Sequence, residues 1–189
     1  MTLFHDLVNA DLFVQAQSDW ETATNGSRDR SATYGIVNHW DAVQGVPDAH
    51  FYLKDNSYGA ILYHIVVRRN GIVDLLSQRY VWHASMGDGE IQALAKAGLI
   101  VPDDQANSNE SNGNPYFFSV CINYHPNEGP VSIRQYQALV TVNQVLIDHF
   151  NLDSGQVFRH MDWTQRKRDI DTISLAQFRI DIDNDDQTP

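Results

Sequence analysis

Short apolar runs separated by polar turns dominate the first two thirds of the chain. Four of them, residues 34–39, 62–67, 72–76 and 117–122, have the length and the content of β-branched and aromatic residues that are typical of strands. Asn70-Gly71 separates the second run from the third, and Asn-Gly is the strongest two-residue signal for a hairpin turn. The pattern therefore predicts a β-hairpin in the middle of the chain, between two further strands.

A helical period replaces the strand pattern after Ser132, which is a suitable N-cap residue. Apolar residues then recur with the spacing of one helix face that packs on a sheet: Ile133, Tyr136, Leu139, Val140, Leu146, Ile147 and Phe150. Residues 156–159 lead as a strand-like run into His160, and residues 174–180 have the pattern of a last short helix. Strand, hairpin, strand and helix in this order predict a single domain of the mixed α/β class.

The two ends of the chain and one internal segment carry no such pattern. Residues 1–30 precede the first clear strand and are interpreted as an N-terminal lead-in, whereas the main domain is expected over residues 31–180. Residues 181–189 form an acidic tail that is expected to fray. Residues 103–115 are rich in Asn, Asp and Ser, so we expect a mobile, exposed loop there.

The charge balance narrows the classes of partner. The 189 residues include 13 Lys and Arg against 24 Asp and Glu, which gives a formal net charge of −11. Such a chain offers little to a phosphate backbone, so nucleic acid is not expected as a partner. No apolar run approaches the roughly 20 residues of a membrane span, and the first residues lack a basic segment followed by an apolar one. We therefore expect no membrane partner, no signal peptide and synthesis in the cytoplasm.

A single cysteine limits the chemistry that a metal site can use. Cys121 alone excludes an intrachain disulfide and a zinc site made of cysteines only. It lies within an apolar run, where we expect a buried and unreactive thiol. Any metal site must therefore rest on carboxylates and on the eight histidines.

Three potential metal ligands stand out although they lie far apart in the sequence. His39 ends an apolar strand, His160 follows another, and Asp169 lies in a segment without a helical pattern. In an extended stretch, Lys167 and Asp169 would face the same side. Two imidazoles and one carboxylate leave a tetrahedral Zn²⁺ one open position, as in catalytic sites. Taken alone, these residues also fit a hydrogen-bonded strand-end histidine and a solvated basic loop, residues 166–168, with Asp169 as its ion-pair partner.

Five short motifs occur in the order of a known family. They are Ile36–Trp40, Leu62–Gly71, Trp82–Ser85, Ser119–Ile122, and His160–Asp162 followed by Lys167–Asp169. In this order they resemble the zinc-dependent N-acetylmuramoyl-L-alanine amidases, the group that contains bacteriophage lysozyme-type amidases and peptidoglycan recognition proteins. The resemblance runs from about Thr33 to Phe178 and is greatest to the amidase modules of phage endolysins. It implies a central mixed β-sheet flanked by helices.

The resemblance assigns the metal site residue by residue. It implies one Zn²⁺ per chain, bound by His39, His160 and Asp169, with Asp169 at a position where some relatives have cysteine. The segment from His160 to Lys167 is one residue shorter than in some relatives, which leaves Asp171 as a less favoured third ligand.

Four further residues take their expected roles from the same resemblance. Tyr63 and Lys167 match a catalytic tyrosine and lysine, and His83 matches a residue that contacts substrate or supports the metal site. Asn123 is a departure, because many relatives carry a catalytic glutamate there. An amide has no titratable proton near neutral pH, so catalysis is expected to rest on Tyr63 and Lys167, while Asn123 binds the substrate or the attacking water.

The resemblance implies hydrolysis of the amide bond between N-acetylmuramic acid and L-alanine in peptidoglycan, by a monomeric phage endolysin that lyses its host. Such a protein would be made in the host cytoplasm and would act on the bacterial cell wall after release. Two alternatives stay open, namely a peptidoglycan-binding module without hydrolysis and a cytosolic amidase that recycles soluble muropeptides. Retention of all three ligands together with Tyr63 and Lys167 argues against the binding module.

Overall fold

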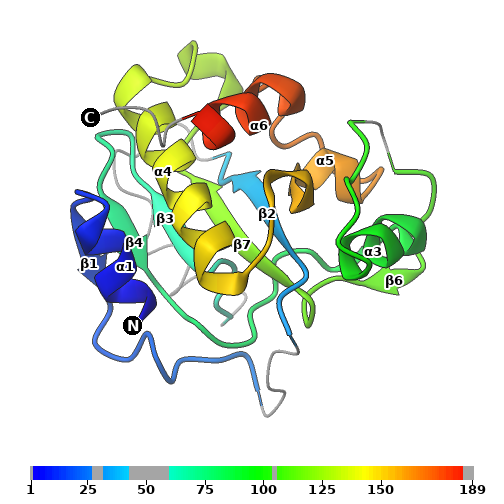
Figure 1. The fold of residues 1–189 in the computed structure, drawn as a ribbon, viewed down its shortest axis with the longest axis horizontal. Coiled ribbons are helices and arrows are strands. Elements are labelled where there is room, and N and C mark those ends of the chain that lie inside the picture. Colours follow the sequence, from blue (N-terminus) through cyan, green and yellow to red (C-terminus); the bar gives the residue numbers. More distant parts are fainter. Residues whose placement is uncertain (1, 27–31, 43–59, 104–105, 185–189) are drawn as a thin grey trace.

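Two adjacent strands, β2 (Gly35–Trp40) and β7 (Phe117–Ile122), form the centre of the sheet in the computed structural model (Figure 1). They run parallel, with His39 opposite Cys121. All their residues are buried except Trp40, which is half-buried. A near-continuous apolar sequence is typical of parallel strands that are covered on both faces. The sequence pattern of these two strands thus reflects their position in the middle of the sheet.

The structure describes residues 2–26, 32–42, 60–103 and 106–184. The other elements within these ranges surround the central pair of strands. They are α1 (Leu3–Asn9), β1 (Val14–Ala16), β3 (Ile65–Val67), β4 (Val73–Leu75), β5 (Met86–Gly87), α3 (Gly89–Lys96), β6 (Ser111–Asn112), α4 (Ile133–Phe150), β8 (Val157–Arg159), α5 (His160–Trp163) and α6 (Leu175–Asn184). The main sheet has the order β1-β4-β3-β7-β2-β8, and only β3 and β4 pair antiparallel in it. The prediction of an α/β fold with a central mixed sheet flanked by helices is confirmed.

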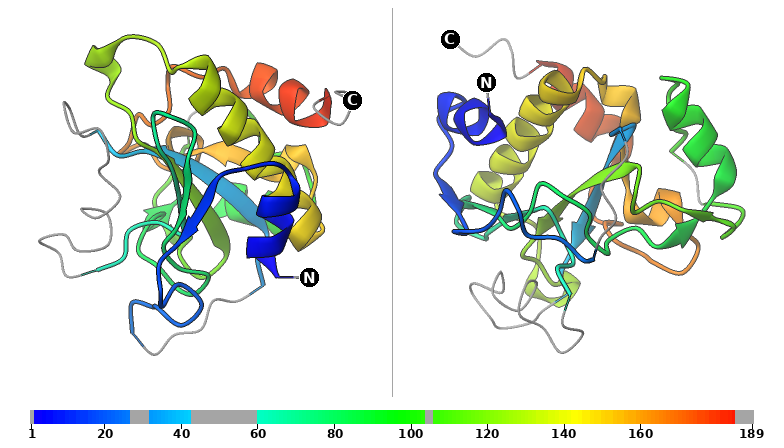
Figure 2. Two further views of the ribbon diagram at one scale, coloured as in Figure 1. Left: turned by 90° about the vertical axis from the view of Figure 1, so that its left-hand side faces the viewer. Right: turned by 90° about the horizontal axis from the view of Figure 1, so that it is seen from below.

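Helices α1, α4 and α6 lie together over one face of the main sheet (Figures 1 and 2). Their apolar side chains, such as Leu7 and Leu139, join Ile36 of β2 in one core cluster. Val37 points to the opposite face, where it belongs to a second cluster with Trp163 of α5 and apolar residues of α3. The sheet is therefore the middle layer between two apolar cores.

Two local predictions are confirmed at the level of single residues. β3 and β4 pair antiparallel across the Asn70-Gly71 turn, where Gly71 has a φ of +84° that a residue with a side chain adopts only under strain. α4 begins after Ser132, whose hydroxyl accepts a hydrogen bond from the backbone N–H of Gln135 at 3.2 Å. The helix ends at Asn151, which is in the left-handed conformation.

The ends of the chain contribute more to the fold than their sequence patterns indicate. Part of the N-terminal lead-in forms α1, which packs on α4, and β1, which pairs with β4. At the other end, α6 continues through residues 181–184, where we expected fraying, because Ile182 is buried in the core. Residues 185–189 of the acidic tail lie outside the described residues.

The prediction of an exposed loop over residues 103–115 holds in part from residue 106 on: residues 107, 109 and 110 are exposed, whereas the end of the segment is buried. Asn114 is buried, and its Oδ1 accepts hydrogen bonds from the backbone N–H groups of Ala84 at 2.7 Å and Ser85 at 2.8 Å. The side chain of Asn114 thus binds backbone N–H groups that have no partner strand at this point. Composition alone does not distinguish such a pinned loop from a mobile one.

Candidate active site

His39 and His160 lie at the carboxyl ends of neighbouring parallel strands, β2 and β8, and therefore meet at one edge of the sheet. Asp169 reaches them from the segment between α5 and α6. Its Oδ2 is 2.9 Å from Nδ1 of His160 and 3.3 Å from Nδ1 of His39. Potential ligand atoms of the three residues all lie within 4.8 Å of one another. Asp171, the less favoured alternative, is exposed and lies outside this cluster.

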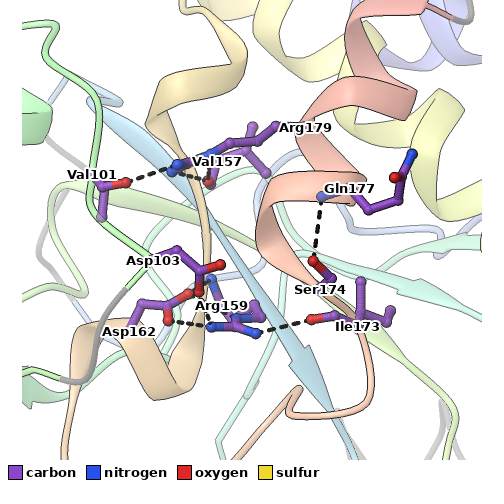
Figure 3. Close-up of polar contacts among 9 residues, drawn as sticks. All are labelled: Val101, Asp103, Val157, Arg159, Asp162, Ile173, Ser174, Gln177 and Arg179. Atoms are coloured by element: carbon purple, nitrogen blue, oxygen red, sulfur yellow. Dashed lines mark hydrogen bonds and ion pairs between the residues drawn. The ribbon is translucent and has the colours of Figure 1, made fainter.

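A buried arginine fixes the junction from which His160 projects (Figure 3). The Arg159 guanidinium binds the carboxylate of Asp162 through Nε at 3.0 Å and Nη2 at 2.7 Å. Its Nη1 donates to the carbonyl of Ile173 at 2.9 Å, just before α6. The Arg159 cluster thus joins β8, α5 and the start of α6, and it holds both ends of the segment that carries Asp169.

Replacing Arg159 by methionine is expected to lower the free energy of unfolding by roughly 3–5 kcal/mol, because the fully buried carboxylate of Asp162 would lose its counter-charge. Urea denaturation of the metal-free proteins measures this loss. The matched control is Asp103→Asn, which removes a second carboxylate partner of Arg159 that is 43% exposed. That change should cost less than about 1 kcal/mol. Equal losses in the two variants would contradict the importance of the buried pair.

The cluster holds His39 and Asp169 in the protonation states that can bind a metal. Burial, together with the neighbouring His160, lowers the pKa of His39 to about 4, so this imidazole is neutral near pH 7. Burial alone would raise the pKa of Asp169, but the adjacent imidazole of His160 outweighs it and holds that pKa well below its usual range. A neutral imidazole and an ionised carboxylate are the forms that coordinate a metal ion.

Hydrogen bonds through His83 determine which nitrogen of His39 faces the cluster. Nε2 of His83 lies 3.0 Å from the Phe117 carbonyl, which can only accept, so the proton of His83 is on Nε2 and its Nδ1 is an acceptor. Burial lowers the pKa of His83 well below its usual value, which keeps the ring neutral. Nε2 of His39, 3.3 Å from Nδ1 of His83, must therefore donate. Nδ1 of His39 is left with a lone pair.

That lone pair belongs to a buried nitrogen with no hydrogen-bond partner among the described residues. It faces Oδ2 of Asp169 across 3.3 Å, and two acceptors at this distance require a cation between them. Two imidazole nitrogens and a carboxylate oxygen are ligands that suit a divalent transition metal. The residues present therefore fit a metal ion held by His39, His160 and Asp169.

We predict that His83→Ala weakens zinc binding by roughly 10- to 100-fold, the usual effect of losing the partner that orients a ligating histidine. Without the acceptor at Nδ1 of His83, the ring of His39 is free to adopt the other tautomer. A competition titration with a chromophoric chelator gives the dissociation constant. Thermal melting of the metal-free proteins separates a loss of metal affinity from a loss of fold. An unchanged dissociation constant would contradict the orienting role.

A cavity of about 680 Å³ opens above the cluster. Aromatic, polar and charged residues from several elements line it: Trp40, Asp41, Ala42, Leu62, Tyr63, Trp82, His83, Ser85, Asn114, His160, Arg166, Lys167, Arg168 and Asp169. Its size suits a substrate with several polar groups rather than a water molecule. The cluster therefore lies where a bound molecule can reach it.

Two of the residues predicted to be catalytic lie on this lining. The ring of Tyr63 is centred 5.0 Å from that of His39, and burial raises the pKa of the Tyr63 hydroxyl well above its usual value. Tyr63 therefore stays protonated and can donate a hydrogen bond. Lys167 is exposed on the segment between α5 and α6, two residues before Asp169. Both side chains border the cavity above the cluster of His39, His160 and Asp169.

Asn123 lies beside the cavity and not on its lining. The residue is buried, its Nδ2 donates to Oδ2 of Asp41, and its Oδ1 accepts from Nη1 of Arg69 at 2.7 Å. Both ends of the amide are thus engaged with protein groups. Its contact with the cavity passes through the carboxylate of Asp41.

The sequence analysis missed two cavity residues of chemical interest. Asp41 follows His39 by two positions, and the alternation of a strand places residues i and i+2 on one face. That spacing is the signal that could have identified it. Trp82, which is 51% exposed on the cavity wall, offers a flat apolar surface to a ligand. In the sequence, Trp82 is only the neighbour of His83, and nothing in the pattern shows whether its ring lies on the surface or in the core.

Two other polar residues near the site are structural. His64 is buried, with Nδ1 2.7 Å from Oγ of Ser119 and Nε2 2.8 Å from the Arg79 carbonyl, and its ring stacks on Phe118. Cys121 is buried, and burial raises the pKa of its thiol well above the usual value. The thiol is therefore held in the unreactive protonated form, as the apolar strand predicted.

Two imidazoles and a carboxylate beneath an open cavity form the kind of site that is found in metal-dependent hydrolases. The sequence matches the N-acetylmuramoyl-L-alanine amidase family over residues 23–171, and the chain belongs to this family. The match spans β2 through Asp169 and so includes all three residues of the cluster. A comparison with curated protein sequences gives no match.

Solved structures of amidases share the fold. The amidase LysC from Clostridium intestinale URNW has a TM-score of 0.57 at 15% identity, over 85% of this chain and 96% of that one. The PlyG catalytic domain has a TM-score of 0.60 at 15% identity, over 93% and 98% of the two chains. The Ph2119 endolysin from the Thermus scotoductus MAT2119 bacteriophage Ph2119 has a TM-score of 0.57 at 15% identity, over 89% and 97%. Among the described residues, no helix has the length and apolar character needed to cross a bilayer.

Proposed function

We propose that this protein hydrolyses the amide bond between N-acetylmuramic acid and L-alanine in peptidoglycan, with one Zn²⁺ bound by His39, His160 and Asp169. The observation that carries the proposal is the buried, unpartnered Nδ1 of His39 beneath the cavity of an amidase-family protein. When bound, Zn²⁺ supplies Lewis-acid chemistry, because it polarises a carbonyl oxygen and increases the acidity of water. The other groups needed for amide hydrolysis are supplied by the chain itself.

Amide hydrolysis creates a negative charge that must be stabilised and a leaving group that must be protonated. Lys167 serves the first need and Tyr63 the second. Attack of water on the lactyl carbonyl creates an oxyanion, and the ammonium of Lys167 on the cavity wall stabilises this charge. The C–N bond then breaks, and the leaving nitrogen needs a proton. The protonated hydroxyl of Tyr63 gives its proton to this nitrogen and regains one from the attacking water, so the phenol is not left ionised.

Digestion of purified peptidoglycan tests the proposal. Mass spectrometry should detect new L-alanine amino termini after incubation with the zinc-loaded protein. A chelator should abolish their formation, and added zinc should restore it. Peptidoglycan that binds the protein but gains no amino termini would favour the binding module without hydrolysis. Cleavage at a different bond would overturn the assignment of the substrate bond.

We further propose that the protein is a phage endolysin, made in the host cytoplasm as a monomer and acting on the bacterial cell wall after release. The resemblance to endolysin structures such as Ph2119 supports this role. The net charge of −11 instead favours small soluble muropeptides, because long-range repulsion slows the approach to an anionic wall. Rates on intact sacculi and on soluble muropeptides, compared at low and high salt, separate the two roles. An endolysin cleaves sacculi at the higher rate.

A further inference from the structure

The carboxylate of Asp41 enters the cavity directly beyond the metal-binding cluster. β2 ends at Trp40, but its pairing with β7 continues, because the backbone N–H of Asp41 donates to the Ile122 carbonyl at 3.1 Å. Asp41 therefore lies on the same face of the strand as His39, with about 7 Å between their Cα atoms from the rise of two residues. Asp41 also lines the cavity together with Tyr63. Its carboxylate can thus reach a substrate bound at the cluster.

The carboxylate is held in a fixed orientation. The backbone N–H of Tyr124 donates to Oδ1 of Asp41 at 3.1 Å, and Nδ2 of Asn123 donates to Oδ2. Arg69 fixes the amide of Asn123 from behind through its 2.7 Å hydrogen bond to Oδ1, and Arg69 is itself paired with Glu128. These contacts hold the carboxylate of Asp41 in one orientation at the cavity that it lines. Asn123 thus acts as a positioning residue for Asp41.

Charge divides the cavity into two sides. Arg166, Lys167 and Arg168 line one wall. Among the described lining residues, the acidic side chains are Asp41 and Asp169, and Asp169 belongs to the metal-binding cluster. Outside the candidate metal cluster, Asp41 is therefore the acidic residue among the described lining residues, and a carboxylate binds N–H donors and cations.

In the proposed reaction, one substrate atom gains positive charge. The oxygen of water becomes bonded to the lactyl carbon, the C–N bond breaks, and the nitrogen leaves as the amino group of L-alanine. With an α-amino pKa of about 8, this group is an ammonium near neutral pH. Interactions that strengthen as this charge develops lower the barrier.

We propose that Asp41 accepts a hydrogen bond from the nitrogen of the scissile amide and stabilises the L-alanine ammonium that leaves. The inference rests on the proposed function of the site. In this role Asp41 transfers no proton, so its contribution is electrostatic. In this arrangement the chain supplies a carboxylate from the residue directly after β2, and the residue directly after β7, Asn123, supplies the amide that orients it.

Calorimetric binding of the product peptide tests this role without turnover. The probes are L-alanyl-D-glutamate with a free amino terminus and the same dipeptide acetylated on that nitrogen, both added to the zinc-loaded protein. The wild type should bind the free amine roughly 10- to 100-fold more tightly, the range for a hydrogen bond to a charged group. Asp41→Asn should lose this preference and lower kcat by a similar factor, with little change in zinc content. The matched control Asp6→Asn removes an equal charge from the Asp6–His149 pair far from the cavity and should leave both properties unchanged.

An exchange of the two partners separates a contact with substrate from a structural role. The double variant Asp41→Asn, Asn123→Asp keeps an amide–carboxylate pair between β2 and β7, but its carboxylate faces Arg69 behind the cavity. It should recover the melting temperature of the wild type and not the preference for the free amine. Recovery of both, or a wild type without the preference, would overturn the proposal. Cleavage of peptidoglycan at another bond would instead contradict the proposed function, while the calorimetry alone decides whether Asp41 binds the amine.

Discussion

The His160→Ala variant is expected to contain no zinc after dialysis and to lose amidase activity by roughly 10³-fold or more. His160 supplies one of two imidazoles in a three-residue site, and its Nδ1 contacts the Asp169 carboxylate at 2.9 Å. Lewis-acid chemistry contributes several kcal/mol, and about 4 kcal/mol corresponds to roughly a thousandfold change in rate. Elemental analysis and the release of L-alanine amino termini measure the two effects.

The matched control for this variant is His149→Ala. His149 lies on α4, where its Nδ1 is 2.8 Å from Oδ2 of Asp6, and it is not part of the cavity lining. This control should keep its zinc and its activity. Zinc also stabilises the native state by mass action, so added zinc should raise the melting temperature of the control and not that of His160→Ala. A full complement of zinc in His160→Ala would contradict the ligand assignment.

The Tyr63→Phe variant is expected to keep its zinc and its fold and to lower kcat by roughly 10²- to 10⁴-fold, the range for loss of a proton-transferring group. The change removes one oxygen and preserves the ring that packs 5.0 Å from His39. Steady-state hydrolysis of a soluble muropeptide separates kcat from KM. The loss should appear in kcat, because the proton moves only after the substrate is bound.

Tyr34→Phe is the control for this second variant. The ring of Tyr34 packs against that of Tyr116, with their centres 6.0 Å apart, and Tyr34 is absent from the cavity lining. Its hydroxyl should be dispensable for hydrolysis. Wild-type turnover in Tyr63→Phe would require another donor for the leaving nitrogen, and the mechanism would have to be redrawn around it.

The sequence predicted the longest elements because their patterns extend over several turns or strand repeats, and the three-residue strands β3 and β4 because the Asn70-Gly71 turn joins them. α4 has 18 residues and an apolar face throughout, and β2 and β7 are six-residue apolar strands. α3 was missed, because its eight residues bury only Ile91 and Ala95, one turn apart. α1 and β1 are shorter still, and their stability comes from packing on α4 and pairing with β4.

Residues of the candidate site were predictable where a side chain able to bind a metal directly follows a predicted strand. His39 and His160 follow apolar runs, and parallel pairing of β2 with β8 brings them together. The tautomer of His39 was not predictable, because it depends on the Phe117 carbonyl acting through His83. This series of hydrogen bonds links three separate segments, so no residue spacing in the sequence reveals it.

The Arg159 cluster connects the last helix to the candidate site. Arg179 of α6 reaches back to the carbonyl of Val157 at 2.7 Å, while Arg159 holds the Ile173 carbonyl before the helix begins. Strand β8, which leads directly into His160, and helix α6 are therefore joined by two contacts, Val157 with Arg179 and Arg159 with Ile173. The unit that supports the candidate site extends beyond Asp169, so a fusion point is expected to be tolerated after residue 184 and not directly after Asp169.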